Sequence, residues 1–167
     1  MKIMETLNFA VWVDADSFPQ KARNFTLEYS FSKKIPVNFV ANHEIKIEPK
    51  YQNAKMIVCQ KEADSADNYI FENAAENDMV LTRDIPFASR LVEKKITVLN
   101  DRGLVFNKEN IEEKLREREF SLNMAQIGLG GNKANFYGEK ELKKFSRTFE
   151  EKILENIMIV TYGVKKR

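Results

Sequence analysis

The chain has 167 residues, a formal net charge of +2, and 43% hydrophobic and 31% charged residues. This composition is that of an ordinary soluble globular protein, and the length suits a single domain over residues 1–167. The small net charge excludes a nucleic-acid binder that relies on bulk positive charge, although local basic patches could still serve that role.

Cysteine and histidine each occur once. The single cysteine, Cys59, excludes an intramolecular disulfide and a cysteine-based zinc site, and the single histidine, His43, argues against a histidine-rich metal site. Any metal is therefore expected to be held by carboxylate oxygens, which favours Mg²⁺ or Mn²⁺. No stretch resembles a signal peptide or a membrane span, so we expect a cytoplasmic protein without a membrane partner.

A run of five hydrophobic residues, Phe9 to Val13, leads directly into Asp14 and Asp16. The run is too short for a typical helix and rich in aromatic and β-branched residues, so it predicts a buried strand. In a parallel sheet the carboxyl end of such a strand faces the crevice where ligands bind. Two carboxylates on the same side of an extended segment repel each other, which predicts a divalent cation between them.

Short apolar runs then alternate with segments of helical spacing. The predicted strands are 37–40, 56–58, 79–81 and 96–99, and the predicted helices are 18–31, 65–75 and 86–94. This alternation predicts a parallel α/β sheet with helices on both faces.

After Leu99 the strand pattern stops. Helical patterns span 107–119, with Asn107 as the cap, and 139–156, and the glycine-rich segment 128–131 separates them. The mixed charges of the helix 107–119 are typical of a solvated face. Residues 157–160 fit either a short strand or a continuation of the last helix.

Acidic residues recur where the predicted strands end. They are Asp14 and Asp16 after the first strand, Asp84 and Asp101 after two later ones, and Asp64 and Asp67 at the start of the helix 65–75. Taken singly, Asp64 and Asp84 also fit helix caps and Asp101 fits a turn. Because the carboxyl ends of parallel strands share one edge of the sheet, we expect four of these acids to converge on a metal: Asp14, Asp16, Asp67 and Asp84.

Such a cluster suits the hydrolysis of phosphodiesters. Ions held by aspartate oxygens neutralise the scissile phosphate and activate water. Arg83, Arg102 or Lys21 would hold neighbouring phosphates, although surface ion pairs explain these cations equally well. We also expect Thr82 and Asn68 among the substrate contacts. The sequence therefore predicts a metal-dependent nuclease acting on RNA or DNA.

Several short motifs occur in order along most of the chain. They are Trp12-Val-Asp-Ala-Asp16, Val40-Ala-Asn42, Ala66-Asp67-Asn68, Asp78-Met-Val-Leu-Thr82 and Asp84-Ile-Pro86, followed by Leu99-Asn100, Arg102-Gly103, Asn110-Ile111 and Gly130-Gly131. With these motifs the chain resembles the YaiI/YqxD family, a bacterial group related to PIN-like nuclease domains.

The resemblance implies a PIN-like three-layer α/β/α fold with a mainly parallel sheet. It places Asp14, Asp16, Asp67 and Asp84 at the acidic motif positions, makes residues 1–8 an N-terminal extension, and leaves 139–160 as a C-terminal helix and tail. The chain also departs from the family pattern at four positions: Phe18 stands where Cys is common, Arg83 replaces a small residue, Asp101 replaces Pro, and Glu119 replaces Asp.

Two other functions fit the sequence. The segment Val13 to Ser17 is also similar to the opening motif of haloacid-dehalogenase-type phosphatases, with Asp14 as nucleophile, Asp16 as general acid and Thr82 as a phosphate contact. Asp101 does not supply the distal acidic pair of that class.

A domain of this kind could also be a non-catalytic module that binds nucleic acid or docks a protein. Phe136 and Tyr137, beside Lys133 and Lys140, fit either base stacking or an anchor of their loop against the core. The apolar stripe of the last helix fits its own sheet and a partner subunit equally well.

Overall fold

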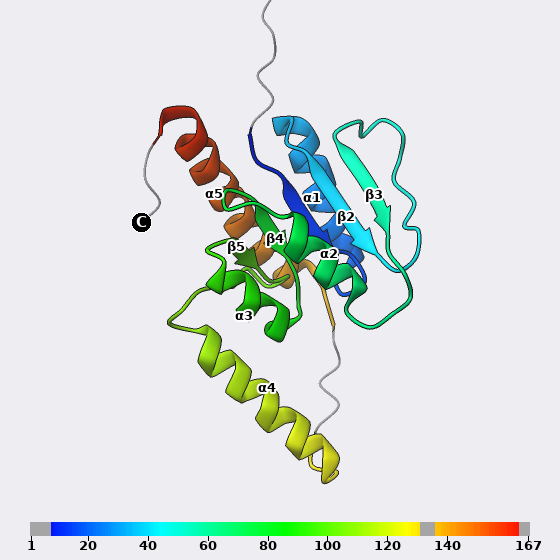
Figure 1. Cartoon of the computed structure of the whole chain (residues 1–167), viewed down its shortest axis with the longest axis vertical. Helices are drawn as coiled ribbons and strands as arrows, with labels where there is room; N and C mark the ends of the chain where they lie inside the picture. The colour runs from blue at the N-terminus through cyan, green and yellow to red at the C-terminus, as the bar shows by residue number, and fades with distance from the viewer. Residues whose placement is uncertain (1–7, 131–135, 164–167) are drawn as a thin grey trace, which may run out of the picture.

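The computed structural model describes residues 8–130 and 136–163, and within them one six-stranded sheet has the order β3-β2-β1-β4-β5-β6 (Figure 1). The parallel strands are β1 (Val11–Asp14), β2 (Val37–Ala41), β3 (Ala54–Val58), β4 (Met79–Leu81) and β5 (Thr97–Leu99), and β6 (Val105–Phe106) is antiparallel to β5. The predicted mainly parallel sheet is confirmed. Residues 1–7 of the predicted extension, Gly131 and Lys133 lie outside the described residues.

The helices of the described ranges cover both faces of the sheet. Helices α1 (Gln20–Lys33) and α5 (Glu139–Tyr162) pack on one face, and α2 (Ser65–Asn73), α3 (Ile85–Glu93) and the start of α4 (Ile111–Gln126) pack on the other. This arrangement confirms the predicted three-layer α/β/α architecture.

Side chains of β1 alternate between the two hydrophobic cores. Val11 and Val13 lie in the core under α1 and α5, whereas Trp12 lies in the core under α2 and α3. Asp14 follows Trp12 by two residues, so the alternation directs its carboxylate to the side of α2 and α3. The alternation of side chains along β1 therefore places Asp14 among α2 and α3 rather than α1 and α5.

The strand pattern of the sequence stops at Leu99, but the structure has a further strand after it. Asn100 turns the chain, because its side-chain Oδ1 accepts the N–H groups of Arg102 (2.9 Å) and Leu104 (2.8 Å). Gly103 takes the left-handed region at φ +80°, which favours glycine. The turn returns the chain as β6, whose two residues are too few to give a strand pattern in the sequence.

The fourth helix differs from the predicted helix 107–119 at both ends. The N–H of Asn107 donates to Oδ1 of Asn110 (2.9 Å), and the N–H of Asn110 donates to Oδ1 of Asn107 (2.8 Å). This reciprocal turn delays the helix to Ile111, and good helix formers then carry it to Gln126.

The last helix settles the open assignment of residues 157–160. They continue α5 as far as Tyr162, where Gly163 ends the helix at φ +65° and donates its N–H to the carbonyl of Ile159. Although α5 is long, its charged residues make it unsuitable as a membrane span. Across the described residues, no helix joins the length and the apolar composition needed to cross a bilayer.

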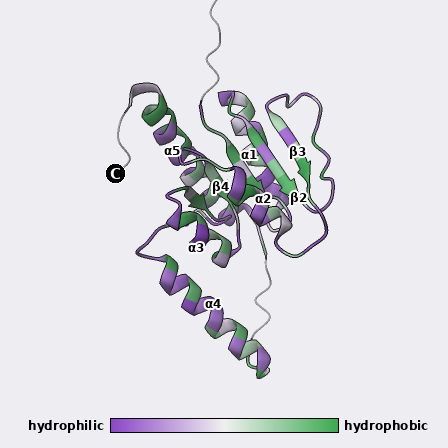
Figure 2. Cartoon of the chain, viewed as in Figure 1, coloured by the Kyte–Doolittle hydropathy of each residue, from purple (hydrophilic) through white to green (hydrophobic). Residues whose placement is uncertain are grey.

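Helix α4 extends away from the sheet and the other helices (Figure 1). Of its residues only Ile111 is buried, and Leu115 packs partly against the core. Further along, Phe120 is 63% exposed, and hydrophobic and hydrophilic residues alternate to the end of the helix (Figure 2). The helix is thus an arm that is fixed at its amino end.

Asp78 braces the edge of the sheet opposite to the predicted site. Its buried carboxylate accepts hydrogen bonds from the N–H groups of Ala10 (2.8 Å) and Ala75 (2.9 Å) and from Nε1 of Trp12 (3.0 Å). This acid therefore has a structural role, because it joins β1, the end of α2 and the start of β4.

Replacing Asp78 by Ala should lower the free energy of unfolding by about 3 kcal/mol or more, because three N–H donors lose their acceptor. Equilibrium unfolding in urea measures this loss. The exposed Glu93→Ala serves as the control and should change stability by less than about 0.5 kcal/mol. Equal stability of the two variants would contradict the bracing role.

Candidate functional site

The candidate site lies where the strand order changes direction. β1 lies between β2 and β4. The chain places β2 and β3 on one side of β1 and then β4, β5 and β6 on the other side. In doubly wound sheets, ligands bind outside the carboxyl ends of the strands at this switch point. Asp14 is the last residue of β1, and Asp84 begins α3 shortly after β4.

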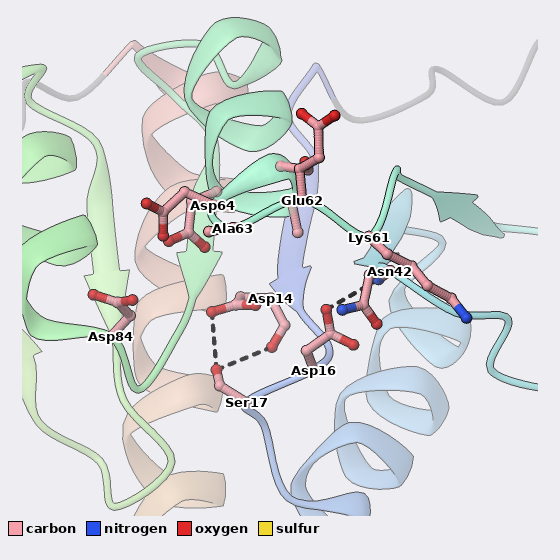
Figure 3. Close-up of a pocket in the computed structure, with 12 residues that line it drawn as sticks. Asp14, Asp16, Ser17, Asn42, Lys61, Glu62, Ala63, Asp64 and Asp84 are labelled. Carbon is pink, nitrogen blue, oxygen red and sulfur yellow. Dashed lines mark hydrogen bonds between the residues drawn. The ribbon is translucent and has the colours of Figure 1, made fainter.

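A cleft of about 330 Å³ opens at the switch point (Figure 3). The acids come from the end of β1, the turn after it, and the starts of α2 and α3. All four predicted aspartates line the cleft, together with three further charged residues: Asp14, Asp16, Asp67 and Asp84, with Lys61, Glu62 and Asp64. The expected convergence of the acids on one edge of the sheet is therefore observed.

Two hydroxyl groups hold the carboxylate of Asp14. Oγ1 of Thr82 and Oγ of Ser17 donate to Asp14 Oδ2 over 2.7 Å and 2.9 Å. Burial raises the pKa of Asp14, the two hydrogen bonds lower it, and Asp84 and Asp16 raise it further. Thr82 is fully buried and also accepts the N–H of Asp84 (3.0 Å), so its hydroxyl positions acids rather than lining the cleft.

Asp16 reaches the cleft through a turn. Residues 15–17 form this turn, so the expectation that one extended segment carries both carboxylates is wrong. Oδ2 of Asp16 accepts the N–H of Asn42 (3.0 Å), and Oδ1 lies 3.1 Å from Nδ1 of His43. The turn thus places Asp16 beside the end of β2, while Asp14 contacts Thr82 after β4.

The other aspartates begin helices. Oδ1 of Asp84 accepts the N–H of Phe87 (3.0 Å), which confirms that Asp84 caps α3. Asp64 occupies the corresponding position of α2, but its side chain makes no cap hydrogen bond, and its backbone takes the left-handed region at φ +61°. The carboxylate of Asp64 is therefore left to the cleft, next to Asp67 in the first turn of α2.

The electrostatic cost of the cluster is largest at Asp67. Burial raises the pKa of Asp67 to about 7, and repulsion from Asp14, Asp84 and Asp64 contributes, while Arg90 offsets part of the rise. A carboxyl group with this pKa is held in surroundings that disfavour its charge. An additional positive charge in the cleft would relieve that cost.

The described residues contain no group of three or more His, Cys, Asp or Glu side chains spaced to hold a metal ion. Mg²⁺ commonly takes only one or two carboxylates and completes its coordination with water and substrate phosphates. Hydrogen bonds use Oδ2 of Asp14 and Oδ1 of Asp84, which leaves the second oxygen of each. One or two of these oxygens, completed by water and substrate phosphates, fit a largely hydrated Mg²⁺ or Mn²⁺.

The predicted phosphate contacts are paired with other acids. Nε of Arg83 lies 3.0 Å from Oδ2 of Asp101, Nη1 of Arg102 lies 3.8 Å from Glu141, and Nζ of Lys21 lies 3.6 Å from Glu139. The lining of the acidic cleft includes none of these three cations. Asp101 is buried beside Arg83 and is separate from the acidic cluster.

Three cations beside the acids were missed by sequence reasoning. Lys61 lines the acidic cleft, and Arg90 and Arg118 line a neighbouring cleft that shares acids with it. Arg90 also donates to Oδ1 of Asn68 (3.2 Å), so this predicted substrate contact is held beside α3. Arg118 belongs to a run of mixed charges typical of a solvated face, so the sequence does not indicate that it lines a cleft.

The loop before α5 is anchored by Tyr137. Its Oη donates to the carbonyl of Asp101 over 2.6 Å, and its ring packs against the core under α5. Burial, and then the charge of Asp101, raise the pKa of Tyr137. The core anchor is therefore confirmed for Tyr137, whereas Phe136 is 72% exposed and its base stacking stays a prediction.

The fold and the cleft define an α/β protein with a mainly parallel sheet and an acidic site at its switch point. The family model described as "Uncharacterized BCR, YaiI/YqxD family" matches residues 12–155. The chain therefore belongs to the YaiI/YqxD family, as the sequence motifs predict. No solved structure matches the chain, so its relation to PIN-like domains stays a prediction.

Curated relatives carry the name UPF0178 protein. The relative from Treponema denticola is 43% identical over 140 residues, which cover 84% of this chain and 88% of the relative. The relative from Psychromonas ingrahamii is 34% identical and the one from Pseudomonas entomophila 33% identical, each over 84% of this chain and over 92% and 93% of the relative.

The raised pKa of Asp67 predicts a pH-dependent stability of the metal-free protein. The folded chain holds this proton up to about pH 7, whereas an unperturbed aspartate releases it near 3.8. The unfolded state then binds fewer protons in this window, so the free energy of unfolding falls as the pH rises through it. Asp67→Asn removes the charge and should be more stable than the wild type at pH 8.

Urea unfolding with a chelator present, from pH 4.5 to pH 8, measures this dependence. The wild type should lose stability toward pH 8, and Asp67→Asn should lose less. Parallel curves for the two proteins would show that Asp67 is not strained in the folded state.

Proposed function

We propose that this chain is a Mg²⁺- or Mn²⁺-dependent phosphodiesterase that cleaves RNA or DNA in the acidic cleft. The observation that carries the proposal is the gathering of aspartates from separate segments around one cleft, with the pKa of Asp67 raised to about 7. Burying like charges together disfavours the folded state, and such perturbed groups are concentrated at functional sites. A divalent cation with a phosphate offsets this cost.

The residues of the cleft have separate tasks. A bound Mg²⁺ or Mn²⁺ supplies charge neutralisation at the phosphate and activation of water. Asp14, Asp67 and Asp84 would hold the ion, directly or through its bound water. Thr82 and Ser17 fix Oδ2 of Asp14, so the orientation of this ligand is set before substrate binds.

Asp16 adds negative charge on the side of β2. The N–H of Asn42 holds its Oδ2, which keeps the carboxylate at the rim of the cleft without a ligand being present. Lys61, the cation of the cleft lining, would balance charge on the phosphate. The predicted relation to PIN-like nucleases agrees with this chemistry, but a shared fold alone does not establish an activity.

Asp14→Asn should lower metal-dependent cleavage of an end-labelled oligonucleotide by about a hundredfold or more, because the cleft loses one ligand charge. Asparagine keeps a side-chain oxygen that Thr82 and Ser17 can donate to, so the thermal midpoint should not fall. The control Glu93→Gln, exposed and outside the cleft, should cleave at the wild-type rate. Full activity of Asp14→Asn would contradict the proposal.

Calorimetric titration with Mn²⁺ and Mg²⁺ separates the remaining alternatives. Stoichiometric binding that Asp14→Asn lacks would support the ligand assignment. Oligonucleotide binding without cleavage, with either metal present, would indicate a non-catalytic nucleic-acid-binding module instead. A phosphoryl group trapped on Asp14 would replace the proposal with the phosphatase chemistry.

A further inference from the structure

A second cleft, of about 310 Å³, adjoins the acidic cleft. Asp64, Asp67 and Asp84 line both, so the two clefts meet along these acids. Arg90 of α3 and Arg118 of α4 also line the second cleft. A cleft lined by both carboxylates and two guanidinium groups suits a chain that carries more than one phosphate, with a cation at the acids.

Arg118 occupies a packing position of α4. It lies on the same side of the helix as Ile111 and Leu115, which precede it by seven and three residues and pack toward α3. A third apolar residue would extend this packing, but the chain has an exposed arginine instead. Within the described residues Arg118 makes no hydrogen bond or ion pair, so its charge is available to a ligand.

Arg90 is fixed by its neighbours on α2. Its Nη1 donates to Oδ1 of Asn68 over 3.2 Å, and its guanidinium lies over the ring of Phe71 at 4.3 Å. These contacts orient the guanidinium of Arg90, and no carboxylate lies within salt-bridge distance of it among the described residues. We call the pair formed by the fixed Arg90 and the exposed Arg118 the cationic wall.

We propose that the cationic wall binds the phosphate next to the scissile phosphate of a nucleic-acid strand. This inference rests on the proposed function and assigns the α4 arm to substrate binding. The acids take the scissile group with the metal, and the wall takes the neighbouring group through charge-assisted hydrogen bonds. The site therefore prefers an oligonucleotide to a substrate with a single phosphodiester.

The test compares Arg118→Ala with Arg116→Ala in steady-state cleavage of a short fluorescent single-stranded oligonucleotide. Arg116 is two residues away on the same helix, about 200° around its axis, and is also exposed. Arg118→Ala should raise KM about tenfold and change kcat little, because one phosphate contact is lost. The slope of the logarithm of the binding constant against the logarithm of the salt concentration should fall in magnitude by about 0.7 for Arg118→Ala. Arg116→Ala should keep the wild-type KM and the wild-type slope.

Two further measurements sharpen the result. The preference of the wild type for the oligonucleotide over a dinucleoside monophosphate, which has one phosphodiester, should shrink in Arg118→Ala. Arg118→Lys retains the charge and should recover part of the lost affinity. Thermal unfolding of each variant checks that α4 is retained.

The outcomes separate the two proposals. If the wild type cleaves and Arg118→Ala matches Arg116→Ala in KM and salt slope, the cationic wall is overturned and the proposed function stands. If the wild type neither binds nor cleaves the oligonucleotide with Mg²⁺ or Mn²⁺, both fall. A loss in kcat alone would also overturn the wall as a phosphate-binding site.

Discussion

The hydrogen bond from Thr82 to Asp14, over 2.7 Å, joins the carboxyl ends of the neighbouring strands β1 and β4 beside the cleft. Because the same hydroxyl accepts the N–H of Asp84, one buried side chain sets the relative position of two acids that repel each other. Ser17 adds a second donor to Asp14, and burial would otherwise make its charge costly. The rest of the cleft depends on this arrangement: Asp16, Asp64 and Asp67 gather around a carboxylate that the sheet holds in place.

Sequence reasoning located the acids because their positions follow from the period and ends of the strands. Each short apolar run marks a buried strand, and the first polar residues after it emerge at the carboxyl edge of the sheet. Asp14 and Asp84 lie at or just after the ends of β1 and β4. Their convergence therefore required only that these two strands be parallel and side by side. Asp67 also followed, because the start of α2 returns to the same edge.

The cations and the last strand depend on contacts that the local pattern does not contain. β6 has two residues and exists because the side chain of Asn100 and the left-handed Gly103 turn the chain back. The position of Arg118 depends on how α4 packs against α3 after the reciprocal turn of Asn107 and Asn110. In a mixed charge run, the residue that faces a cleft looks the same as its solvated neighbours.

Arg83 and Asp101 stand at two positions where the family resemblance predicts other residues, and their side chains pair with each other. The resemblance suggested a small residue and a proline at these positions, and the structure pairs the two side chains at 3.0 Å with Asp101 only 3% exposed. Asp101 is buried whereas the Arg83 side chain is 30% exposed, so loss of Arg83 alone would leave a buried carboxylate without its partner, which is unfavourable. The pairing also holds the guanidinium of Arg83 beside Asp101, which follows the end of β5. The cations that line the two clefts with the acids are Lys61, Arg90 of α3 and Arg118 of α4, and the positions of the two arginines follow from helix packing rather than from the strand ends.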